Sequence, residues 1–439
     1  MRYQTEDGNL TLAATGDNLI TRRIAGYTEP DFLKVFQIIR ACDARFANLE
    51  MLFHDYEGYP AGDTRGTWMR AHPETLDDLK WAGFNLVSIA NNHTMDYGVG
   101  GLEATIREVR SRGFTFAGAG MNLDEARAPS YLDLPAGRIA LLAATSSFPP
   151  SAMAGRQRPD IQGRPGVSGL RHRRLFQVPE ETFAALSSLR DQLQLKSPRQ
   201  RRLESGFGPD DEEGLDFAGV EFAPGDGPRV VTEPQEEDIR DICRWIKDAK
   251  RQADWVLFSF HAHEEGTDRH FPAEFVSKAC RRFIDEGVDV VMGHGPHLMR
   301  GVEIYRNRPI IYSAGNFVYQ GETLTKLPSG YYERFDLGPE ATPADAFDAR
   351  SGGGHVGRPA DPVYWESILP VVRFQGWQLK SVDLHPLVLG FGKARTHRGR
   401  PLLAGTEAAE EIIGKVADLS EPFGTEIICE NGVGKVRLG

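Results

Sequence analysis

The stretch Val288–Gly301, VDVVMGHGPHLMRG, decides the fold because it joins a buried strand to two histidines. Its first four residues are mostly apolar and predict a strand that breaks at Gly293, after which His294 and His297 follow. A hydrophobic run ending in Gly-His is typical of a parallel sheet that delivers side chains to its carboxyl edge. Neutral imidazole is a common metal ligand. The alternative interpretation is a strand-to-loop turn with two solvated histidines.

The same arrangement recurs along the chain, where other apolar runs end in polar residues. The runs at 10–14, 44–49, 84–90 and 255–260 lead into Asp17, Glu50, Asn92-His93 and His261-Ala262-His263, respectively. Each group alone has a plain explanation, such as an Asx-turn, a solvated edge carboxylate or a hydrogen-bonded core histidine. Helical segments separate the runs, which predicts parallel strands whose carboxyl ends meet. The groups together therefore predict one site.

Carboxylate, imidazole and amide oxygen suit manganese, iron or zinc. Two such ions could share one carboxylate, polarise a phosphoryl or carbonyl group and lower the pKa of a bound water to about 7. A histidine beside the ions could protonate a leaving group while a carboxylate orients its ring. The predicted metal ligands are Asp17, Glu50, Asn92, His261, His294 and His297. The predicted catalytic residues are His93, Asp17 and His297, and the predicted supporting or substrate-binding residues are Asp96, Arg164, His263, Ser313 and Asn316.

The composition of the chain limits the kinds of molecule that it is expected to bind. The chain has 439 residues and a formal net charge of −11, which argues against nucleic acid as a partner because phosphate backbones demand a basic surface. An anionic substrate stays open, since a metal reverses the local field. The four cysteines are scattered and predict reduced thiols. No signal-peptide core and no apolar run of 18 residues is present, so we expect no membrane span and a cytoplasmic location.

The predicted domain layout is a core interrupted twice. Residues 1–147 and 233–319 form the core, and residues 363–439 complete it with strands and a helix. Residues 148–232 are rich in Pro, Gly and charge, with one predicted helix, Pro179–Leu195. Long irregular segments in compact domains are often functional loops, so this insertion is expected to shape the site. Residues 320–362 are a second Gly- and Pro-rich insertion. Helix-strand alternation followed by antiparallel strands predicts a four-layer α/β/β/α sandwich of two mixed sheets.

These motifs resemble a known family. TGDN, ANLE, SIANNHTMDYG, SFHAHEE, GHGPHLMRGVEIY and PIIYSAGNF follow the motif order of the bacterial poly-γ-glutamate capsule-synthesis proteins (CapA-like), which are similar to calcineurin-like metallophosphoesterases. By this resemblance Asp17 matches the first aspartate and Glu50 the bridging acid. Asn92 and His93 match the asparagine and the catalytic histidine, and the later histidines match the closing motifs.

Two departures from the superfamily pattern concern the metal. Leu19 stands where many phosphoesterases have a histidine, and Glu50 replaces an aspartate. The closing histidines are also separated by two residues instead of one. The chain is therefore expected to bind two ions, or none.

Three functions follow. The first is a metal-dependent hydrolase acting on a phosphoester or on an amide of a peptide-like substrate, which could be a small molecule, a peptide or an anionic polymer. The second is a metal-independent peptide epimerase, in which an Asp17 carboxylate and a histidine exchange the proton of a carbon acid. The third is a non-catalytic factor in poly-γ-glutamate or capsule assembly.

Overall fold

The computed structural model describes residues 7–64, 66–196, 201, 205–206 and 214–438, so parts of the predicted ranges 1–147, 148–232 and 363–439 lie outside it. The described residues form a ten-stranded mixed sheet in the order β23-β24-β21-β20-β1-β2-β5-β6, with β19 added to β1 and β22 to β21. Its strands are β1 (Leu10–Leu19), β2 (Ala44–Leu49), β5 (Leu86–Ser88), β6 (Thr115–Ala117), β19 (Asn316–Tyr319), β20 (Glu366–Gln375), β21 (Gln378–Val388), β22 (Leu402–Leu403), β23 (Ile427–Glu430) and β24 (Val433–Val436).

A second mixed sheet has the strand order β17-β18-β16-β15-β9-β8. Its strands are β8 (Ser130–Leu134), β9 (Gly137–Thr145), β15 (Trp255–His261), β16 (Val290–His294), β17 (Val302–Tyr305) and β18 (Arg308–Ile311). The central strands β9, β15, β16 and β18 run parallel, and β8 and β17 pair antiparallel at the edges.

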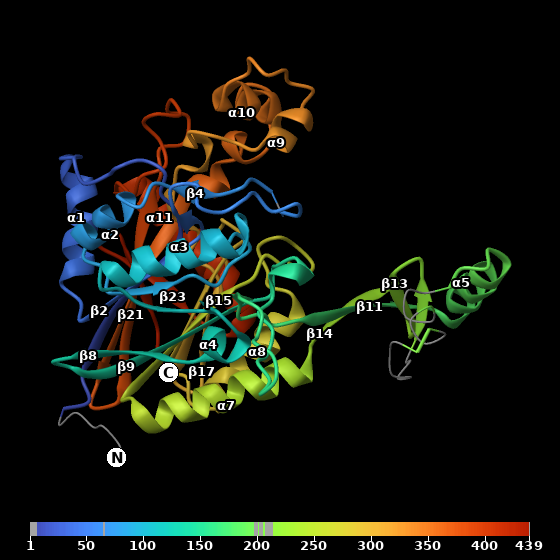
Figure 1. The fold of residues 1–439 in the computed structure, drawn as a ribbon. Coiled ribbons are helices and arrows are strands. Elements are labelled where there is room, and N and C mark those ends of the chain that lie inside the picture. Colours follow the sequence, from blue (N-terminus) through green and yellow to red (C-terminus); the bar gives the residue numbers. More distant parts are fainter. Residues whose placement is uncertain (1–6, 65, 197–200, 202–204, 207–213, 439) are drawn as a thin grey trace.

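The two sheets pack face to face with helices on both outer faces (Figure 1). This layering arises because successive side chains of a strand point to opposite faces of the sheet. Leu12 and Ala14 of β1 pack between the sheets, whereas Ala13 packs against the outer helices. The helices are α1 (Pro30–Arg40), α2 (Thr75–Ala82) and α3 (Gly98–Ser111) on the larger sheet, and α7 (Glu236–Gln252) and α8 (Glu274–Asp285) on the smaller. The predicted four-layer sandwich of two mixed sheets is confirmed.

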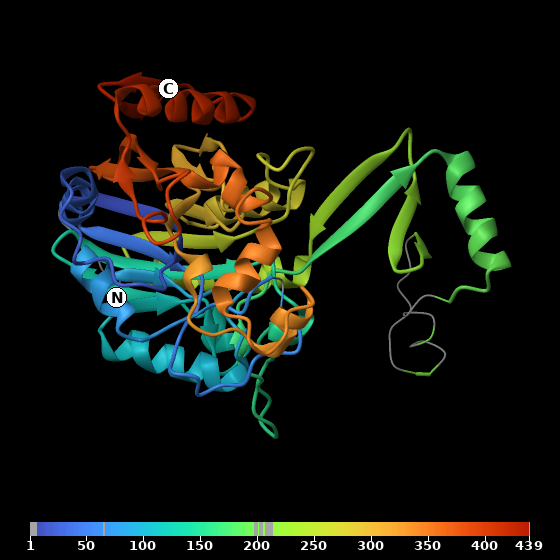
Figure 2. The same ribbon diagram turned by 90° about the horizontal axis from the view of Figure 1, so that it is seen from above.

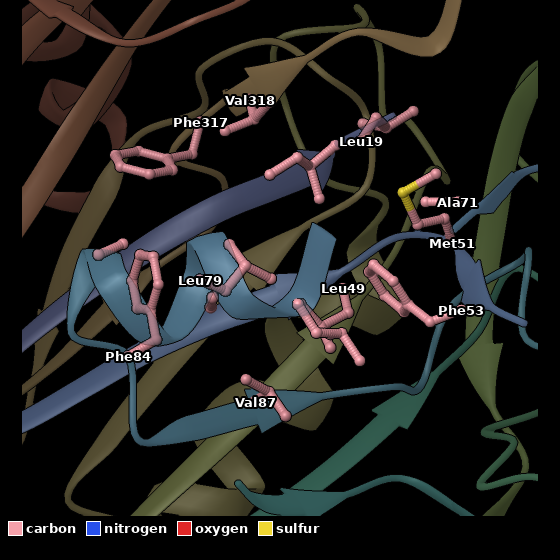
Figure 3. Close-up of a cluster of buried hydrophobic side chains, with 14 of the residues drawn as sticks. Leu19, Leu49, Met51, Phe53, Ala71, Leu79, Phe84, Val87, Phe317 and Val318 are labelled. Atoms are coloured by element: carbon pink, nitrogen blue, oxygen red, sulfur yellow. The ribbon is translucent and has the colours of Figure 1, made fainter. Parts of the chain in front are cut away.

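The core beneath α1–α3 reaches the carboxyl end of β1. Figure 3 shows Leu19, Leu49 and Met51 in one apolar cluster with Phe317 and Val318, all nearly fully buried. The apolar ends of β1, β2 and β19 thus fix the backbone on which the polar residues of the neighbouring site stand. Leu19 is part of this core, which explains why an apolar residue is tolerated there.

Strand β1 continues to Leu19, past the predicted end at Ala14. It continues because Asp17 pairs with Asn48 of β2 and with Asn316 of β19. Gly16 permits this pairing, since a Cβ there would lie 1.8 Å from the Gly315 carbonyl oxygen.

The Gly16→Ala substitution is expected to lower the free energy of unfolding by about 1–3 kcal/mol, the usual range for overpacked core mutants. Thermal unfolding followed by circular dichroism measures this. Gly26→Ala is the control, because a Cβ at Gly26 meets nothing within 4 Å. Equal stability of the two variants would contradict the packing of β1 on the 315–316 backbone.

The first insertion is more regular than predicted. Besides the expected helix, now α5 (Glu180–Gln192), it forms a sheet of β11 (His172–Val178), β12 (Leu215–Phe217), β13 (Val220–Pro224) and β14 (Arg229–Pro234). Phe176 and Phe222 pair across β11 and β13, with ring centroids 5.7 Å apart. Aromatic residues such as these, and the β-branched residues of β14, favour strands although the Pro and Gly content of the insertion had suggested loops. This sheet and α5 project from the body as an arm (Figures 1 and 2).

The second insertion lies on the body as short helices (Figure 1). They are η2 (Gly321–Thr323), α9 (Ser329–Glu333), α10 (Pro343–Ser351), η3 (Arg358–Ala360) and η4 (Pro362–Trp365). Helix α11 (Thr406–Ser420) covers β21 and the β23–β24 hairpin. The remaining short elements are β3 (Leu52–Phe53), β4 (Arg70–Ala71), β7 (Ala119–Gly120), α4 (Leu123–Arg127), η1 (Pro150–Ala152), β10 (Gly166–Val167) and η5 (Glu421–Phe423).

Candidate metal centre

The carboxyl ends of strands from both sheets meet at one place. Asp17 at the end of β1 pairs in register with Asn48 of β2, one residue short of the strand end. In the other sheet His261 of β15 pairs with His294 of β16. Parallel strands end at a common edge, and here the edges of both sheets face each other, which brings together residues about 280 positions apart.

Asp17 is fully buried and held in place by two donors. The Asn48 side-chain amide donates to Oδ1 at 2.9 Å, and the Gly295 backbone N–H donates to Oδ2 at 3.0 Å. Burial raises the pKa of Asp17 to about 6, against the lowering effect of these two hydrogen bonds. The same carboxylate lies 3.5 Å from Nδ1 of His297. Asn48 was not among the predicted site residues, although it shares a strand face with Glu50.

Glu50 is also fully buried, and neither of its carboxyl oxygens has a hydrogen-bond partner among the described residues. Its Oε1 lies 3.4 Å from Nε2 of His297 and 3.8 Å from Nε2 of both His261 and His263. Burial and the nearby Asp17 carboxylate raise the pKa of Glu50 well above its usual range. A buried carboxylate without a donor is costly unless a cation compensates it.

The imidazoles direct their ring nitrogens toward one another. Nδ1 of His261 lies 2.9 Å from Nδ1 of His294, and Nε2 of His261 lies 3.1 Å from Nε2 of His263 and 2.9 Å from the Asn92 side-chain oxygen. Burial lowers the pKa of His294 to about 3 and holds the pKa of His261 well below its ordinary value. Both rings are therefore neutral at physiological pH, which is the form that binds metal.

Further residues fix these rings. The Ser259 hydroxyl lies 2.7 Å from Nε2 of His294, and the Asn316 side-chain oxygen lies 2.9 Å from Nδ1 of His297. The Asn316 amide also donates to the His297 backbone carbonyl at 2.9 Å, and His297 itself has φ of 64°. Ser313, predicted as a supporting residue, is buried and donates to the Leu298 carbonyl, so it stabilises the loop that carries His297.

His93 and Asp96 form a dyad beside the carboxylates. Nδ1 of His93 lies 2.6 Å from Asp96 Oδ2, and Nε2 lies 3.0 Å from the Asn92 amide and 4.0 Å from Glu50 Oε1. Asp96 is itself held by the Met69 N–H at 2.7 Å. The hydrogen bond to Asp96 orients the ring of His93 with Nε2 toward the cluster.

The donor set fits divalent metal. Three groups bring ligand atoms within 4.8 Å of one another: Asp17, His261 and His294; Glu50, His261 and His263; and Asp17, Glu50 and His297. Mixed carboxylate and neutral imidazole is the ligand chemistry of manganese, iron and zinc. The Glu50 oxygens, which no described residue hydrogen-bonds, and the facing nitrogens of the histidines are the atoms that would bind such ions. His263, predicted as a supporting residue, is placed here among the potential ligands.

A cavity of about 400 Å³ opens over this cluster. His93, His263 and His297 line its floor, and the second insertion lines its wall through Arg350 and Arg358, among others. None of the described residues of 148–232 lines it, so their expected role in shaping the site stays a prediction. Arg164 is exposed and donates to the Met153 carbonyl at 2.9 and 3.0 Å.

Arg358 is a cavity residue that sequence reasoning missed. A single arginine in the Gly-rich stretch Gly352–Arg358 has no periodicity or strand end to mark it, and surface arginines are common. Its position becomes visible only when the insertion packs over the carboxyl ends of the strands.

Most of the chain matches a known protein family. The family model described as "Bacterial capsule synthesis protein PGA_cap" matches residues 11–321, which include every predicted metal ligand. The chain belongs to the PGA_cap family. The resemblance drawn from the motifs is confirmed, and the family match ends as the second insertion begins.

Named relatives extend the match. The uncharacterized proteins y4sH and y4uA of Sinorhizobium fredii are each 36% identical over 98% of this chain and 93% of their own length. The PGA biosynthesis protein CapA of Bacillus subtilis is 26% identical over 77% of this chain and 74% of its own. The capsule biosynthesis protein CapA of Bacillus anthracis is 25% identical over 73% of this chain and 62% of its own. In this PGA_cap protein, the described part of the chain contains no helix both long and apolar enough to traverse a bilayer.

Proposed function

We propose that this PGA_cap protein is a divalent-metal-dependent hydrolase acting on a phosphoester or on an amide of a peptide-like substrate. One observation carries the proposal: Glu50 is fully buried among the ring nitrogens of His261, His263 and His297, and no described residue hydrogen-bonds its carboxyl oxygens. A protein that needed only a stable core would place an apolar residue there. Glu50 belongs to two of the three potential ligand groups, so its carboxylate would help to hold divalent metal there.

When bound, the ions supply Lewis acidity and an activated water. The chain's own residues do the rest. The Gly295 N–H and the Asn48 amide hold Asp17 in one orientation, and Ser259 and Asn316 do the same for His294 and His297. Fixed ligands avoid reorganisation during the reaction.

His93 supplies the proton for the leaving group. It lines the cavity, and its Nδ1 is held by Asp96 at 2.6 Å, so Nε2 is the nitrogen that faces the substrate. A histidine positioned in this way typically accelerates a reaction by about 10²–10⁴-fold. Phe347 and Val356 give part of the cavity wall an apolar surface.

The geometry favours this function over the epimerase alternative. An epimerase needs both the base and the acid in contact with the substrate carbon, but Asp17 is fully buried beneath the cluster and does not line the cavity. Of the predicted catalytic pair Asp17 and His297, only His297 lines the cavity. The role of an assembly factor, suggested by the relatives' names, is compatible with the fold but does not account for the buried carboxylates.

The test uses protein purified without a histidine tag, stripped with EDTA and returned to MnCl₂ or ZnCl₂. Metal content is measured by mass spectrometry on the same samples that are assayed with aryl phosphomonoesters, phosphodiesters and glutamate-containing peptides. We expect bound metal and hydrolysis of at least one substrate class that EDTA removes. Absence of both bound metal and metal-stimulated hydrolysis would exclude the proposal.

A further inference from the structure

Arg358 places a positive charge over the cavity. It begins η3 in the second insertion and lines the cavity together with His93 and His297. It is also the cation whose field acts on both buried carboxylates, since it lowers the pKa of Asp17 and of Glu50 against the larger effect of burial. The guanidinium is therefore close enough to the cluster to act on a group bound there.

Arg358 has no carboxylate bound to it directly. It takes part in none of the ion pairs between described residues. Its side chain hydrogen-bonds Tyr319, a neutral partner, and its guanidinium carbon lies 5.7 Å from the centroid of the Tyr364 ring. The nearby acid on the cavity wall, Glu322, is already paired with Arg398. Arg358 thus faces the cavity with donors that the surrounding acids do not occupy.

Arg350 has a similar environment on the same wall. Its Nη1 donates to the hydroxyls of Thr67 at 2.9 Å and of Tyr331 at 3.2 Å, both of which are neutral. Neither arginine forms an ion pair with an acid among the described residues, although the chain has a net charge of −11. A local positive field of this kind attracts an anionic ligand that the rest of the surface would repel.

The backbone of Arg358 is anchored although the preceding loop is glycine-rich. The Trp365 indole N–H donates to the Arg358 carbonyl at 3.0 Å, and Trp365 is 2% exposed. Gly357 immediately before it has φ of 69°, a conformation that L-residues rarely adopt. The chain is therefore turned sharply and then fixed, which presents the guanidinium at a defined place.

We propose that Arg358, with Arg350 beside it, forms an oxyanion subsite that selects substrates carrying a carboxylate or phosphate next to the bond that is cleaved. That the bound molecule is a substrate rests on the proposed function, whereas oxyanion binding at the subsite does not depend on it. The planar guanidinium binds either oxyanion through two parallel N–H donors, which a lysine cannot do.

The experiment measures binding by isothermal titration calorimetry, with and without Mn²⁺. The probes are inorganic phosphate, a short glutamate-containing peptide and the same peptide with glutamine in place of glutamate. The proteins are wild type, Arg358→Gln and Arg358→Lys. Arg174→Gln serves as the control, because Arg174 is an exposed arginine on the arm, and Arg164→Gln tests the arginine that the sequence had indicated. Thermal melting verifies that each variant is folded.

We expect Arg358→Gln to weaken binding of phosphate and of the glutamate peptide at least tenfold, with a smaller loss for Arg358→Lys and no change for the other two variants. The glutamine peptide should bind wild type at least tenfold more weakly than the glutamate peptide. The ratio of phosphate to peptide affinity then distinguishes the two oxyanions. Unchanged affinity in Arg358→Gln, a loss only in Arg164→Gln, equal binding of the two peptides, or no binding of any probe to wild type would overturn the subsite. Arg358-dependent binding without metal-stimulated hydrolysis would support the subsite and contradict the proposed hydrolase function.

Discussion

Replacing Glu50 with glutamine is expected to make the metal-free protein more stable and to abolish its stabilisation by manganese. The folded protein raises the pKa of Glu50 well above 4.5, because the carboxyl is buried beside the Asp17 carboxylate and no described residue donates a hydrogen bond to it. A glutamate with a raised pKa costs stability whenever the unfolded chain would be ionised. The gain from glutamine is therefore absent near pH 4 and increases as the pH rises above 4.5.

At pH 8 we expect the metal-free Glu50→Gln variant to melt about 2–6 °C above wild type, which corresponds to relief of one unsatisfied buried carboxylate. Wild type should gain about 2.7 kcal/mol when manganese is present at 100 times its dissociation constant. The variant should lose most of this gain because it lacks the shared ligand. Differential scanning calorimetry between pH 4 and pH 8, with EDTA or MnCl₂, measures both effects.

Glu303→Gln is the matched control. Glu303 is also buried, but its carboxylate accepts from Arg281 at 2.8 Å and from the Tyr312 hydroxyl at 2.6 Å. Its substitution is expected to lower the melting temperature and to leave the manganese effect unchanged. A Glu50→Gln variant that is less stable than wild type without metal, or that keeps the full manganese effect, would show that Glu50 is a structural carboxylate.

The second large effect concerns His93. His93→Ala is expected to lower the rate of metal-stimulated hydrolysis by about 10²–10⁴-fold, because the proton for the leaving group is lost. Manganese stabilisation should persist, since His93 belongs to none of the three ligand groups among the described residues. Initial rates and melting curves on the same samples separate the two properties. His72→Ala is the control, because His72 is an exposed histidine outside the cavity lining.

Asp96→Asn refines the same test. Asp96 accepts from Nδ1 of His93 and orients the ring, so its loss should shift the pH-rate profile and reduce the rate by less than His93→Ala does. Wild-type rates in both variants would remove the proton-donor role. A cell-based capsule assay that tolerates His93→Ala would favour the assembly-factor alternative.

The sequence was sufficient for the parts of the fold that depend on local patterning. The apolar runs of β1, β9 and β15 and the apolar stripes of α7 and α8 can each be read from residues close together in the chain. Polar residues just after buried strands also predicted the cluster, because parallel strands deliver their ends to one edge. Of the predicted ligands, His261 lies 3.9 Å from Asp17 and 3.8 Å from Glu50, measured between ring nitrogens and carboxyl oxygens.

What the sequence could not reveal depends on long-range packing. The orientation of Asp17 follows from contacts with Asn48 and Gly295, which are 31 and 278 positions away. Arg358, which no local pattern marks, reaches the cavity because the second insertion folds over it. Arg164, which was predicted to meet the substrate, donates to the Met153 carbonyl instead. Cross-strand pairs such as Phe176 and Phe222 in the arm are likewise invisible until the register is known.

The most direct test of the central claim is an anomalous-scattering map from crystals soaked in MnCl₂ and measured at the manganese edge. The account predicts strong peaks within the ligand groups of Asp17, Glu50, His261 and His297, absent from Glu50→Gln crystals treated in the same way. A fully soaked wild-type crystal with no anomalous peak among these residues would contradict it.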